Sequence, residues 1–172
     1  EGNHLESDLK FSSSYLEATK AALTSVGQES SVVYNENQKT NTSEKFVASI
    51  IIPVFNKAHH TRRCIRAIIN NTPDVHFEVI IIDNCSTDGT KEYLQGLSGD
   101  IKIIHNTENV GYTIACNQGA EVANGCYLVF LNNDTEPQAG WLSSLIRLAS
   151  SDPTIGAIGS KLVYPDGSLQ EA

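Results

Sequence analysis

Several residue types are scarce in this sequence of 172 residues, and each shortage argues against a class of protein. Methionine is absent and the chain begins at Glu1, so no initiator is visible, and we expect the chain to be a piece of a longer polypeptide. Only 12 residues are lysine or arginine, against 20 aspartates and glutamates, which gives a formal charge of −8. This balance argues against nucleic acid or anionic lipid as the main partner, because both require clustered basic side chains.

Long apolar segments and paired cysteines are also missing. No run approaches the roughly 18 apolar residues that a transmembrane helix needs, and the polar amino-terminal region lacks the apolar core of a signal peptide. The four cysteines include no C-x-x-C pair, which argues against structural zinc and favours reduced thiols. We therefore expect a cytoplasmic protein without a transmembrane segment, and peripheral membrane association of the parent protein stays open.

Two glycine-rich nucleotide-binding motifs are absent as well. The first predicted strand ends in Pro53-Val54-Phe55-Asn56, without the G-x-G-x-x-G that a dinucleotide-binding unit places there. The sequence also has no G-x-x-x-x-G-K-[ST], which excludes a P-loop nucleotidase.

The composition divides the chain into two regions. In residues 1–45, leucines at approximate helical spacing predict a helix over about 5–24, and a polar linker follows. Residues 46–172 form the second region, in which strands alternate with helices. The predicted strands cover 47–54, 77–82, 101–104, 126–131 and 155–163, and the predicted helices cover 61–70, 88–97, 111–123 and 141–149. This alternation predicts an α/β fold with a mostly parallel sheet and helices on both faces, in which ligands bind beyond the carboxyl ends of the strands.

Polar residues and glycines follow the strands at this predicted edge. Asp83 ends an apolar run, where a carboxylate is costly unless it accepts hydrogen bonds, and a ligand would satisfy it. Helix capping explains Ser86 and Asp88 well, and Ser86 or Thr87 is the expected cap of the helix predicted over 88–97. Asn109 and Gly111 open a helix whose N-terminus favours a phosphate, although both residue types are also routine in loops.

Asp134 follows the strand 126–131 and is the strongest candidate for a metal ligand. A Mg²⁺ or Mn²⁺ that serves a diphosphate takes one or two carboxylates and fills its shell with phosphate oxygens and water. The alternative is that Asp134 caps a helix beginning near Pro137, a task that Thr135 could also perform.

Taken together and in order, five segments resemble the donor half of an inverting family 2 glycosyltransferase with the GT-A fold, a Rossmann-like nucleotide-sugar-binding unit truncated at the C-terminus. They are Ser49–Asn56, Ile82–Thr90, Asn109–Gly111, Asn117–Gly119 and Leu131–Asp134. The resemblance covers roughly residues 46–172. Each motif is weak alone, but five in this order and spacing are specific.

The resemblance implies a role for each matching position. Pro53, Phe55 and Asp83 would hold the base and ribose, and Asn109 and Gly111 would lie near the phosphates. Asp134 matches the last acid of the family's D-x-D motif, which binds Mg²⁺ or Mn²⁺, whereas Asn132 replaces the first acid and brings no charge. The full set expected to contact the nucleotide-sugar is Pro53, Val54, Phe55, Asn56, Asp83, Asn84, Ser86, Asn109, Gly111, Asn117, Asn132 and Asn133.

The resemblance also implies the reaction and its partners. A hydroxyl of a glycan or lipid-linked acceptor would attack the sugar of a nucleotide-diphospho-sugar while a carboxylate takes its proton. Such parents serve cell-surface polysaccharide biosynthesis. Of the acids close to or after Asp134, none has the setting of a base: Glu136, Asp152, Asp166 and Glu171. We expect the base beyond residue 172, in the remainder of the parent polypeptide, and no transfer by this fragment alone.

Two other functions remain compatible with the sequence. One is a non-catalytic α/β interaction module derived from a glycosyltransferase fold, which the substitution at Asn132 keeps open. The other is a metal-dependent nucleotidyltransferase, which would normally carry a glycine-rich basic loop where this chain has Asn56-Lys57-Ala58-His59-His60.

Overall fold

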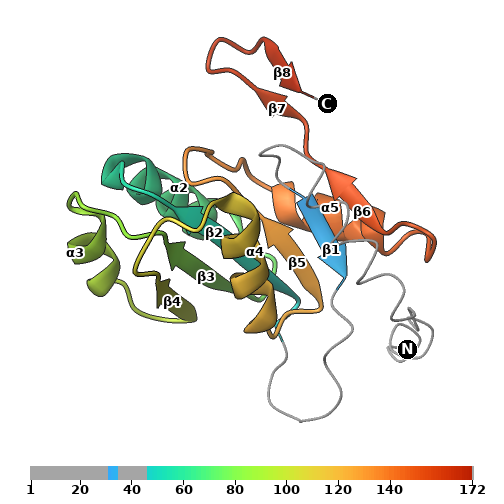
Figure 1. The fold of residues 1–172 in the computed structure, drawn as a ribbon. Coiled ribbons are helices and arrows are strands. Elements are labelled where there is room, and N and C mark those ends of the chain that lie inside the picture. Colours follow the sequence, from blue (N-terminus) through green and yellow to red (C-terminus); the bar gives the residue numbers. More distant parts are fainter. Residues whose placement is uncertain (1–30, 35–45, 172) are drawn as a thin grey trace.

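The computed structural model describes residues 31–34 and 46–171 (Figure 1). Strands β4 (Ile101–His105), β3 (Phe77–Asp83), β2 (Ala48–Val54) and β5 (Tyr127–Phe130) lie side by side in that order, all parallel. Helices α2 (Ala58–Asn71), α3 (Thr90–Gln95) and α4 (Tyr112–Glu121) connect them, and α5 (Trp141–Ala149) follows β5. These elements confirm the strands and helices predicted between residues 46 and 149, with small differences in their bounds.

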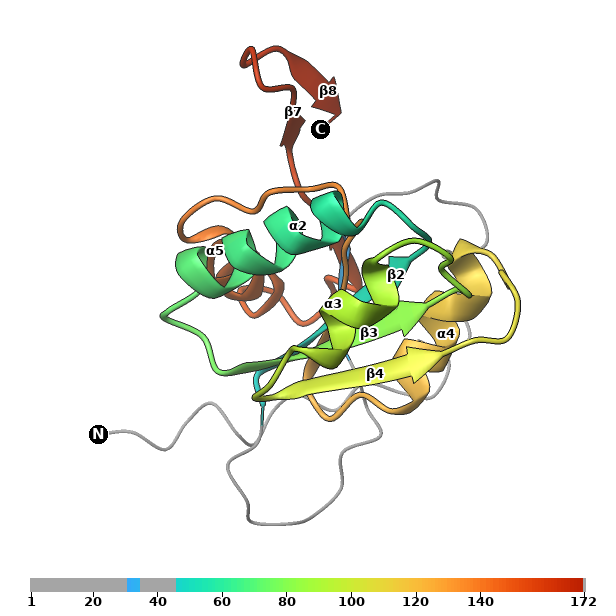
Figure 2. The ribbon, with the colours of Figure 1, turned by 90° about the vertical axis from the view of Figure 1, so that its left-hand side faces the viewer.

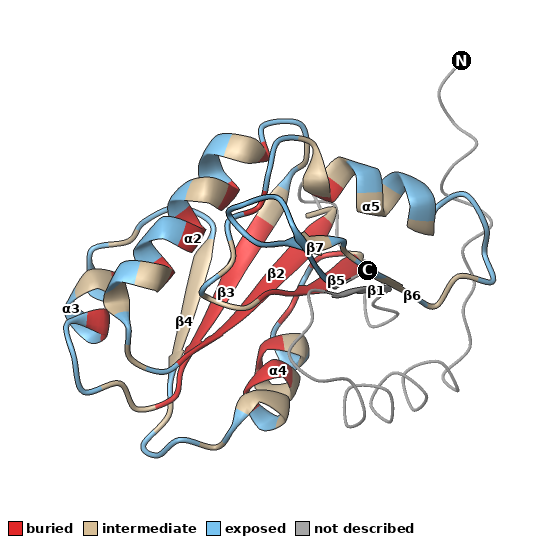
Figure 3. Cartoon of the chain, turned by 90° about the horizontal axis from the view of Figure 1, so that it is seen from above, coloured by how far each residue is buried: buried red, intermediate tan, exposed pale blue. Residues whose placement is uncertain are grey.

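Helices cover both faces of the sheet, as the sequence predicts. Figure 3 shows α2, α3 and α5 on one face and α4 on the other. Ile50 and Ile52 of β2 belong to the apolar cluster under α2, α3 and α5, whereas Ile51 belongs to the cluster under α4. Successive side chains of a strand point to opposite faces, so the continuous apolar run of β2 contributes to two cores. Within the described residues, no helix has the length and apolar character needed to span a bilayer.

Two glycines allow backbone segments to approach the sheet closely. A Cβ atom on Gly119 of α4 would lie 2.5 Å from Cγ2 of Ile51, so a larger residue would push the helix away. A Cβ atom on Gly125, before β5, would lie 2.4 Å from the carbonyl carbon of Ala48. The second contact is with backbone, which cannot move aside as a flexible side chain can.

A buried carboxylate organises the amino edge of the sheet. Glu78 of β3 is 1% exposed and lies 2.7 Å from Oγ of Ser49 and 2.9 Å from Nζ of Lys102. The backbone N–H and side-chain amide of Asn124 also donate to it, at 2.5 and 3.2 Å. Burial opposes ionisation of Glu78, but hydrogen bonds from Lys102, Ser49 and Asn124 outweigh it and hold the pKa of this carboxyl below its usual value.

The sheet continues beyond β5 through two short antiparallel strands. Strand β1 (Ser31–Tyr34) pairs with β5 on one side and with β6 (Ala157–Gly159) on the other. Strand β1 was not predicted, and it lies within the segment expected to be a polar linker. The rest of that segment and the helix predicted over about 5–24 lie outside the described residues.

The prediction of a single strand over 155–163 was wrong. Strand β6 ends at Gly159, and the residues after it form β7 (Leu162–Val163), which pairs with β8 (Leu169–Glu171) in a separate hairpin. The segment Tyr164-Pro165-Asp166-Gly167 has the residue types of a turn and forms one, with the Tyr164 N–H donating to the Ser168 carbonyl at 2.9 Å. This turn gives β7 a local partner, and Figures 1 and 2 show the hairpin projecting from the body of the molecule.

Candidate functional site

The predicted site segments meet at the carboxyl edge of the parallel strands. In the sheet register Val54 is opposite Asp83, and Asp83 is opposite His105. The Leu131 N–H donates to the Ile51 carbonyl at 3.0 Å, which fixes the point where the chain leaves β5. The loops after β2, β3 and β5 therefore begin beside one another.

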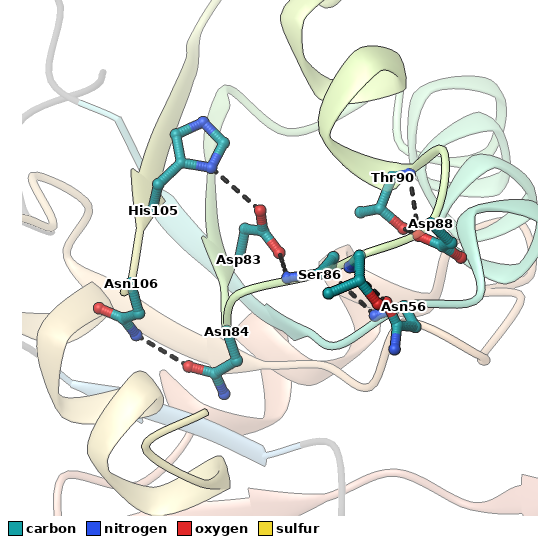
Figure 4. Close-up of polar contacts among 9 residues, drawn as sticks. Asn56, Asp83, Asn84, Ser86, Asp88, Thr90, His105 and Asn106 are labelled. Atoms are coloured by element: carbon teal, nitrogen blue, oxygen red, sulfur yellow. Dashed lines mark hydrogen bonds and ion pairs between the residues drawn. The ribbon is translucent and has the colours of Figure 1, made fainter. Parts of the chain in front are cut away.

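Reciprocal hydrogen bonds join the loops after β2 and β3. The Asn56 N–H donates to Ser86 Oγ at 2.8 Å, and the Thr87 N–H donates to Asn56 Oδ1 at 2.7 Å (Figure 4). The Ala58 N–H donates to Asp88 Oδ2 at 3.1 Å. Asn56 and Ser86 were both predicted to contact the nucleotide-sugar; they lie together in the structure, but their side chains connect the two loops.

The predicted capping of helix α3 by Ser86 or Thr87 was wrong. The helix begins at Thr90 with Gly89 at its N-cap, and Asp88 Oδ1 accepts hydrogen bonds from the Thr90 hydroxyl and N–H at 2.5 and 2.9 Å. The hydroxyl bond is the main reason that the pKa of Asp88 lies below its usual value.

Left-handed backbone at ordinary residues also concentrates in these loops. Asn56, Lys57 and Cys85 have φ of 57°, 57° and 63°, and in the described part of the chain no other non-glycine residue has positive φ. Such conformations cost free energy and persist where surrounding contacts enforce them. The hydrogen bonds between the two loops supply that enforcement.

Asp83 is buried and hydrogen-bonded within the protein. Its side chain is 3% exposed. One oxygen accepts the Ser86 N–H at 2.9 Å, and the other lies 3.0 Å from Nδ1 of His105 (Figure 4). The cost of burying Asp83 is therefore met without a ligand, and burial alone does not argue for one. His105 was not predicted as a site residue, although His105 ends the strand next to β3 and so lies opposite Asp83.

A network of side-chain amides connects β3, β4 and α4. Asn106 donates to Asn84 Oδ1 at 2.8 Å and exchanges two hydrogen bonds with Gln118, at 2.9 and 3.0 Å. Asn84 in turn donates to the Gly111 carbonyl at 3.4 Å. The network holds the turn before α4 and uses Gln118 in place of its predicted neighbour Asn117. Asn106 and Gln118 were both missed as site residues, although Asn106 directly follows β4 and Gln118 lies within the segment Asn117–Gly119.

The turn before α4 leaves room for a ligand beside its backbone. Gly111 is the N-cap with φ of 81°, and no atom lies within 4 Å of the position that a Cβ would take there. The Gly111 N–H donates to Asn109 Oδ1 at 3.0 Å, so Asn109 shapes this turn. The predicted helix start is confirmed one residue later, at Tyr112.

The predicted residues of strand β2 differ in accessibility. Pro53 and Val54 are buried, with Val54 in the apolar core, so their side chains do not line the edge. Phe55 directly follows the strand and is 49% exposed. Among these three residues, only the Phe55 ring is open to a ligand.

The loop after β5 presents Asp134 at the surface. Asp134 is exposed and makes no hydrogen bond or ion pair with the described residues. Helix α5 begins only at Trp141 with Gly140 at its N-cap, so neither Asp134 nor Thr135 caps it. The Thr135 hydroxyl donates instead to the Asn132 carbonyl at 2.8 Å. The capping alternative for Asp134 is therefore excluded.

The chemistry of this loop fits a cation that is only partly bound by protein. No cluster of three or more His, Cys, Asp or Glu side chains with metal-binding geometry occurs among residues 31–34 and 46–171. One accessible carboxylate suffices where phosphate oxygens and water complete the shell. Asn132 and Asn133, both half-buried, directly precede Asp134 and carry neutral amides.

Side chains of helix α2 contact the loop that follows β5. Asn133 Nδ2 donates to Thr61 Oγ1 at 3.0 Å, and the Cys64 thiol lies 3.6 Å from the Asn132 carbonyl oxygen. Burial raises the pKa of Cys64 to about 12, so this thiol keeps its proton and can donate it. The sequence analysis did not assign Thr61 or Cys64 to the site, because both belong to the inward stripe of a helix.

Comparison with known proteins gives one family. A model of the family described as Glycosyl transferase family 2 matches residues 49–172. Glycosyltransferase AglE of Haloferax volcanii is 33% identical over 132 residues, which cover 73% of this chain and 43% of that protein. O-antigen biosynthesis protein RfbC of Myxococcus xanthus is 33% identical over 127 residues, which cover 72% of this chain and 10% of that protein. The chain thus spans less than half the length of these curated relatives.

Solved glycosyltransferases share the fold. Mannosyltransferase PcManGT from Pyrobaculum calidifontis, in complex with GDP-Man and Mn²⁺, has a TM-score of 0.59 at 19% identity, covering 83% of this chain and 40% of that chain. S. aureus TarS 1–349 has a TM-score of 0.51 at 23% identity, covering 59% of this chain and 32% of that chain. These likenesses confirm the predicted α/β fold of the GT-A type.

Proposed function

Because this chain belongs to glycosyltransferase family 2, we propose that its carboxyl edge binds the nucleotide-diphospho-sugar donor of an inverting, metal-assisted glycosyltransferase. The observation that carries the proposal is the position of Asp134. Its exposed carboxylate makes no hydrogen bond or ion pair with the described residues, and it lies on a loop fixed at the same edge as the joined loops after β2 and β3. The Asp134 carboxylate therefore takes part in none of the described hydrogen bonds or ion pairs that stabilise the fold.

Three groups along the edge suit three parts of the donor. The exposed Phe55 ring offers an apolar face on which a base can stack. Asp83 lies at the carboxyl end of β3, held by Ser86 and His105, and can accept a hydrogen bond from the base or ribose. The open backbone at Gly111 and the N-terminus of α4 suit the phosphates.

Asp134 would hold the divalent cation, Mg²⁺ or Mn²⁺, through its carboxylate. Asn132 supplies an amide but no charge at the position of the family's first acid, so we expect weaker metal binding than in a site with two acids. When bound, the cation would offset the charge that develops on the diphosphate. PcManGT is described in complex with Mn²⁺, which supports a cation in this fold.

The proposed reaction is an in-line displacement at the anomeric carbon. A hydroxyl of a glycan or lipid-linked acceptor attacks from the side opposite the diphosphate, and a new C–O bond forms. The bond to the β-phosphate oxygen breaks, its electron pair leaves with the nucleoside diphosphate, and the hydroxyl proton passes to a carboxylate. The O-antigen role of RfbC supports a surface glycan as the acceptor.

None of the described acids near Asp134 or after it has the setting of that base. Glu136 forms an ion pair with Arg63 at 2.5 Å. Asp152 and Asp166 lie exposed in turns, where hydrogen bonds from Thr154 and Ser168 hold their pKa values below the usual range. We place the base in the parent protein beyond residue 172, and expect this chain alone to bind donor weakly and to transfer no sugar.

Calorimetric titration of the chain with UDP, dTDP and GDP, each with Mn²⁺ and then with EDTA, tests the proposal. We expect one nucleotide to bind in a metal-dependent manner and Asp134→Asn to abolish that dependence. Asp74→Asn is the matched control, because Asp74 is also exposed but lies between α2 and β3, at the opposite edge of the sheet. Absence of binding by the folded chain and by a longer form that includes the following residues would favour a non-catalytic module instead.

A further inference from the structure

The loop that carries Asp134 is held mainly by a helix that lies far from it in sequence. The last sheet hydrogen bond before the loop joins Leu131 to Ile51. Beyond it, the contacts to α2 are the Asn133 amide on Thr61, the Cys64 thiol on the Asn132 carbonyl, the Arg63–Glu136 ion pair and a 2.8 Å hydrogen bond from Asn71 to the Pro137 carbonyl. These contacts span the whole loop from residue 132 to residue 137.

Two residues with polar groups, Thr61 and Cys64, lie on the face of α2 that packs on the sheet. Thr61 and Cys64 are fully buried and share a helix face with Ile65 and Ile68 of the apolar core. An aliphatic side chain would pack there without needing a partner, whereas a buried hydroxyl requires a hydrogen bond. Thr61 obtains that bond from the Asn133 amide, 72 residues away in the sequence.

The position of Asp134 depends on its neighbours, because its own side chain is not attached to the described protein. Asn132 is fixed through its carbonyl, which accepts from Cys64 and from Thr135, and Asn133 is fixed through its side chain on Thr61. These two residues directly precede Asp134. The backbone that carries the Asp134 carboxylate is therefore held by α2.

We propose that Thr61 is a positioning residue for the donor site: its buried hydroxyl anchors Asn133 and thereby holds Asp134 in the orientation that a cation bound to the donor diphosphate requires. This inference rests on the proposed function. Thr61 lies on α2, outside the strand-end segments that resemble the family. Removal of the hydroxyl should weaken metal-dependent binding and leave metal-independent binding of the nucleotide unchanged.

The test compares Thr61→Val with Thr61→Ser by calorimetric titration with the nucleotide that the unaltered chain binds best. We expect Thr61→Val to raise the Kd measured with Mn²⁺ about three- to tenfold, the range of one net hydrogen bond. The Kd measured in EDTA should change less than about twofold, and Thr61→Ser should restore binding with Mn²⁺. A change of equal size in Mn²⁺ and in EDTA would overturn the inference, since a merely structural role affects both.

A double-mutant cycle with Asn133→Ala locates the effect. If Thr61 acts through Asn133, Asn133→Ala alone should reproduce the loss, and adding Thr61→Val should cost little more. Additive losses would refute this route. Should Thr61→Val fail to fold, Asn133→Ala removes the same hydrogen bond from the half-buried loop side and carries the test alone. Metal-dependent binding that neither variant changes overturns the inference only, whereas no binding by the unaltered chain overturns the proposed function with it.

Discussion

Replacement of Glu78 by glutamine should destabilise the fold strongly, because Glu78 is a buried carboxylate with several hydrogen-bond donors around it. Glu78 is buried at the amino edge of the sheet, where its two oxygens receive donors from Ser49, Lys102 and Asn124. Glutamine has almost the same shape but carries an NH₂ group in place of one oxygen. At least one of these donors must then face another donor.

The magnitude follows from the exposure of the partners. A buried donor that loses its acceptor costs about 1 to 3 kcal/mol. The lost pairing with Lys102, whose side chain is 40% exposed, adds only about 1 kcal/mol because solvent screens it. We therefore expect Glu78→Gln to lower the free energy of unfolding by about 2 to 4 kcal/mol at pH 7, and Tm by roughly 5 to 15 °C.

The pH dependence has a definite sign. The pKa of Glu78 is lower in the folded chain than its usual value of about 4.3, so the unfolded state binds more protons in this range. Its contribution to stability is complete above the unfolded pKa and is lost as the pH falls through the folded pKa. The difference between the unaltered chain and Glu78→Gln should therefore narrow as the pH is lowered from 7 to about 3.

Urea denaturation followed by circular dichroism measures both quantities. Glu121→Gln is the control, because Glu121 is exposed at the end of α4, and we expect its effect to stay within about 0.5 kcal/mol. Equal stability of Glu78→Gln and the unaltered chain at pH 7 would refute the reasoning. So would a difference between them that stays constant down to pH 3.

Two further predictions concern packing. Gly125→Ala should lower the free energy of unfolding by about 3 kcal/mol, because its Cβ would collide with the backbone of Ala48; Gly89→Ala, with ordinary φ and nothing within 4 Å of its Cβ, should be neutral or raise it by up to about 1 kcal/mol. A loss of equal size for both alanines in urea denaturation would contradict this. A thiol reagent at pH 8 should modify the partly exposed Cys85 and Cys126 in the folded chain, and all four thiols only after unfolding, because burial raises the pKa of Cys64 and of Cys116 to about 12. Rapid modification of all four thiols in the folded chain, measured by mass spectrometry, would contradict this prediction, because it would show that the core opens.

The central sheet and its functional edge could be predicted because their signals are local. Apolar runs of β-branched residues mark β2 and β3, and the polar residues that end them mark the carboxyl edge. Once the strands are parallel, those ends must lie together, whatever the details of the loops. This is why the segments at Asn56, Asp83 and Asp134 converge as the sequence predicts.

The contacts within the edge could not be predicted, because they depend on register and on side-chain geometry. His105 pairs with Asp83 only because β4 is placed next to β3 with those residues opposite each other. The amide network of Asn106 and Gln118 needs the packing of α4 to be known. Strand β1 is four residues long, and its place in the sheet is set by β5 and β6 and not by its own pattern.

The structure also divides the predicted residues of the edge into two groups with different consequences for binding. Asn56, Ser86, Asn84 and Asn133 were all predicted to contact the nucleotide-sugar, yet their side chains contact other loops or, for Asn133, helix α2. Phe55 is half exposed and Asp134 is exposed, so these two remain open to a ligand. Substitutions in the first group should therefore weaken binding indirectly, by releasing a loop, and should also lower stability. Loss of the Asp134 carboxylate should weaken metal-dependent binding while leaving stability unchanged, since no described hydrogen bond depends on it.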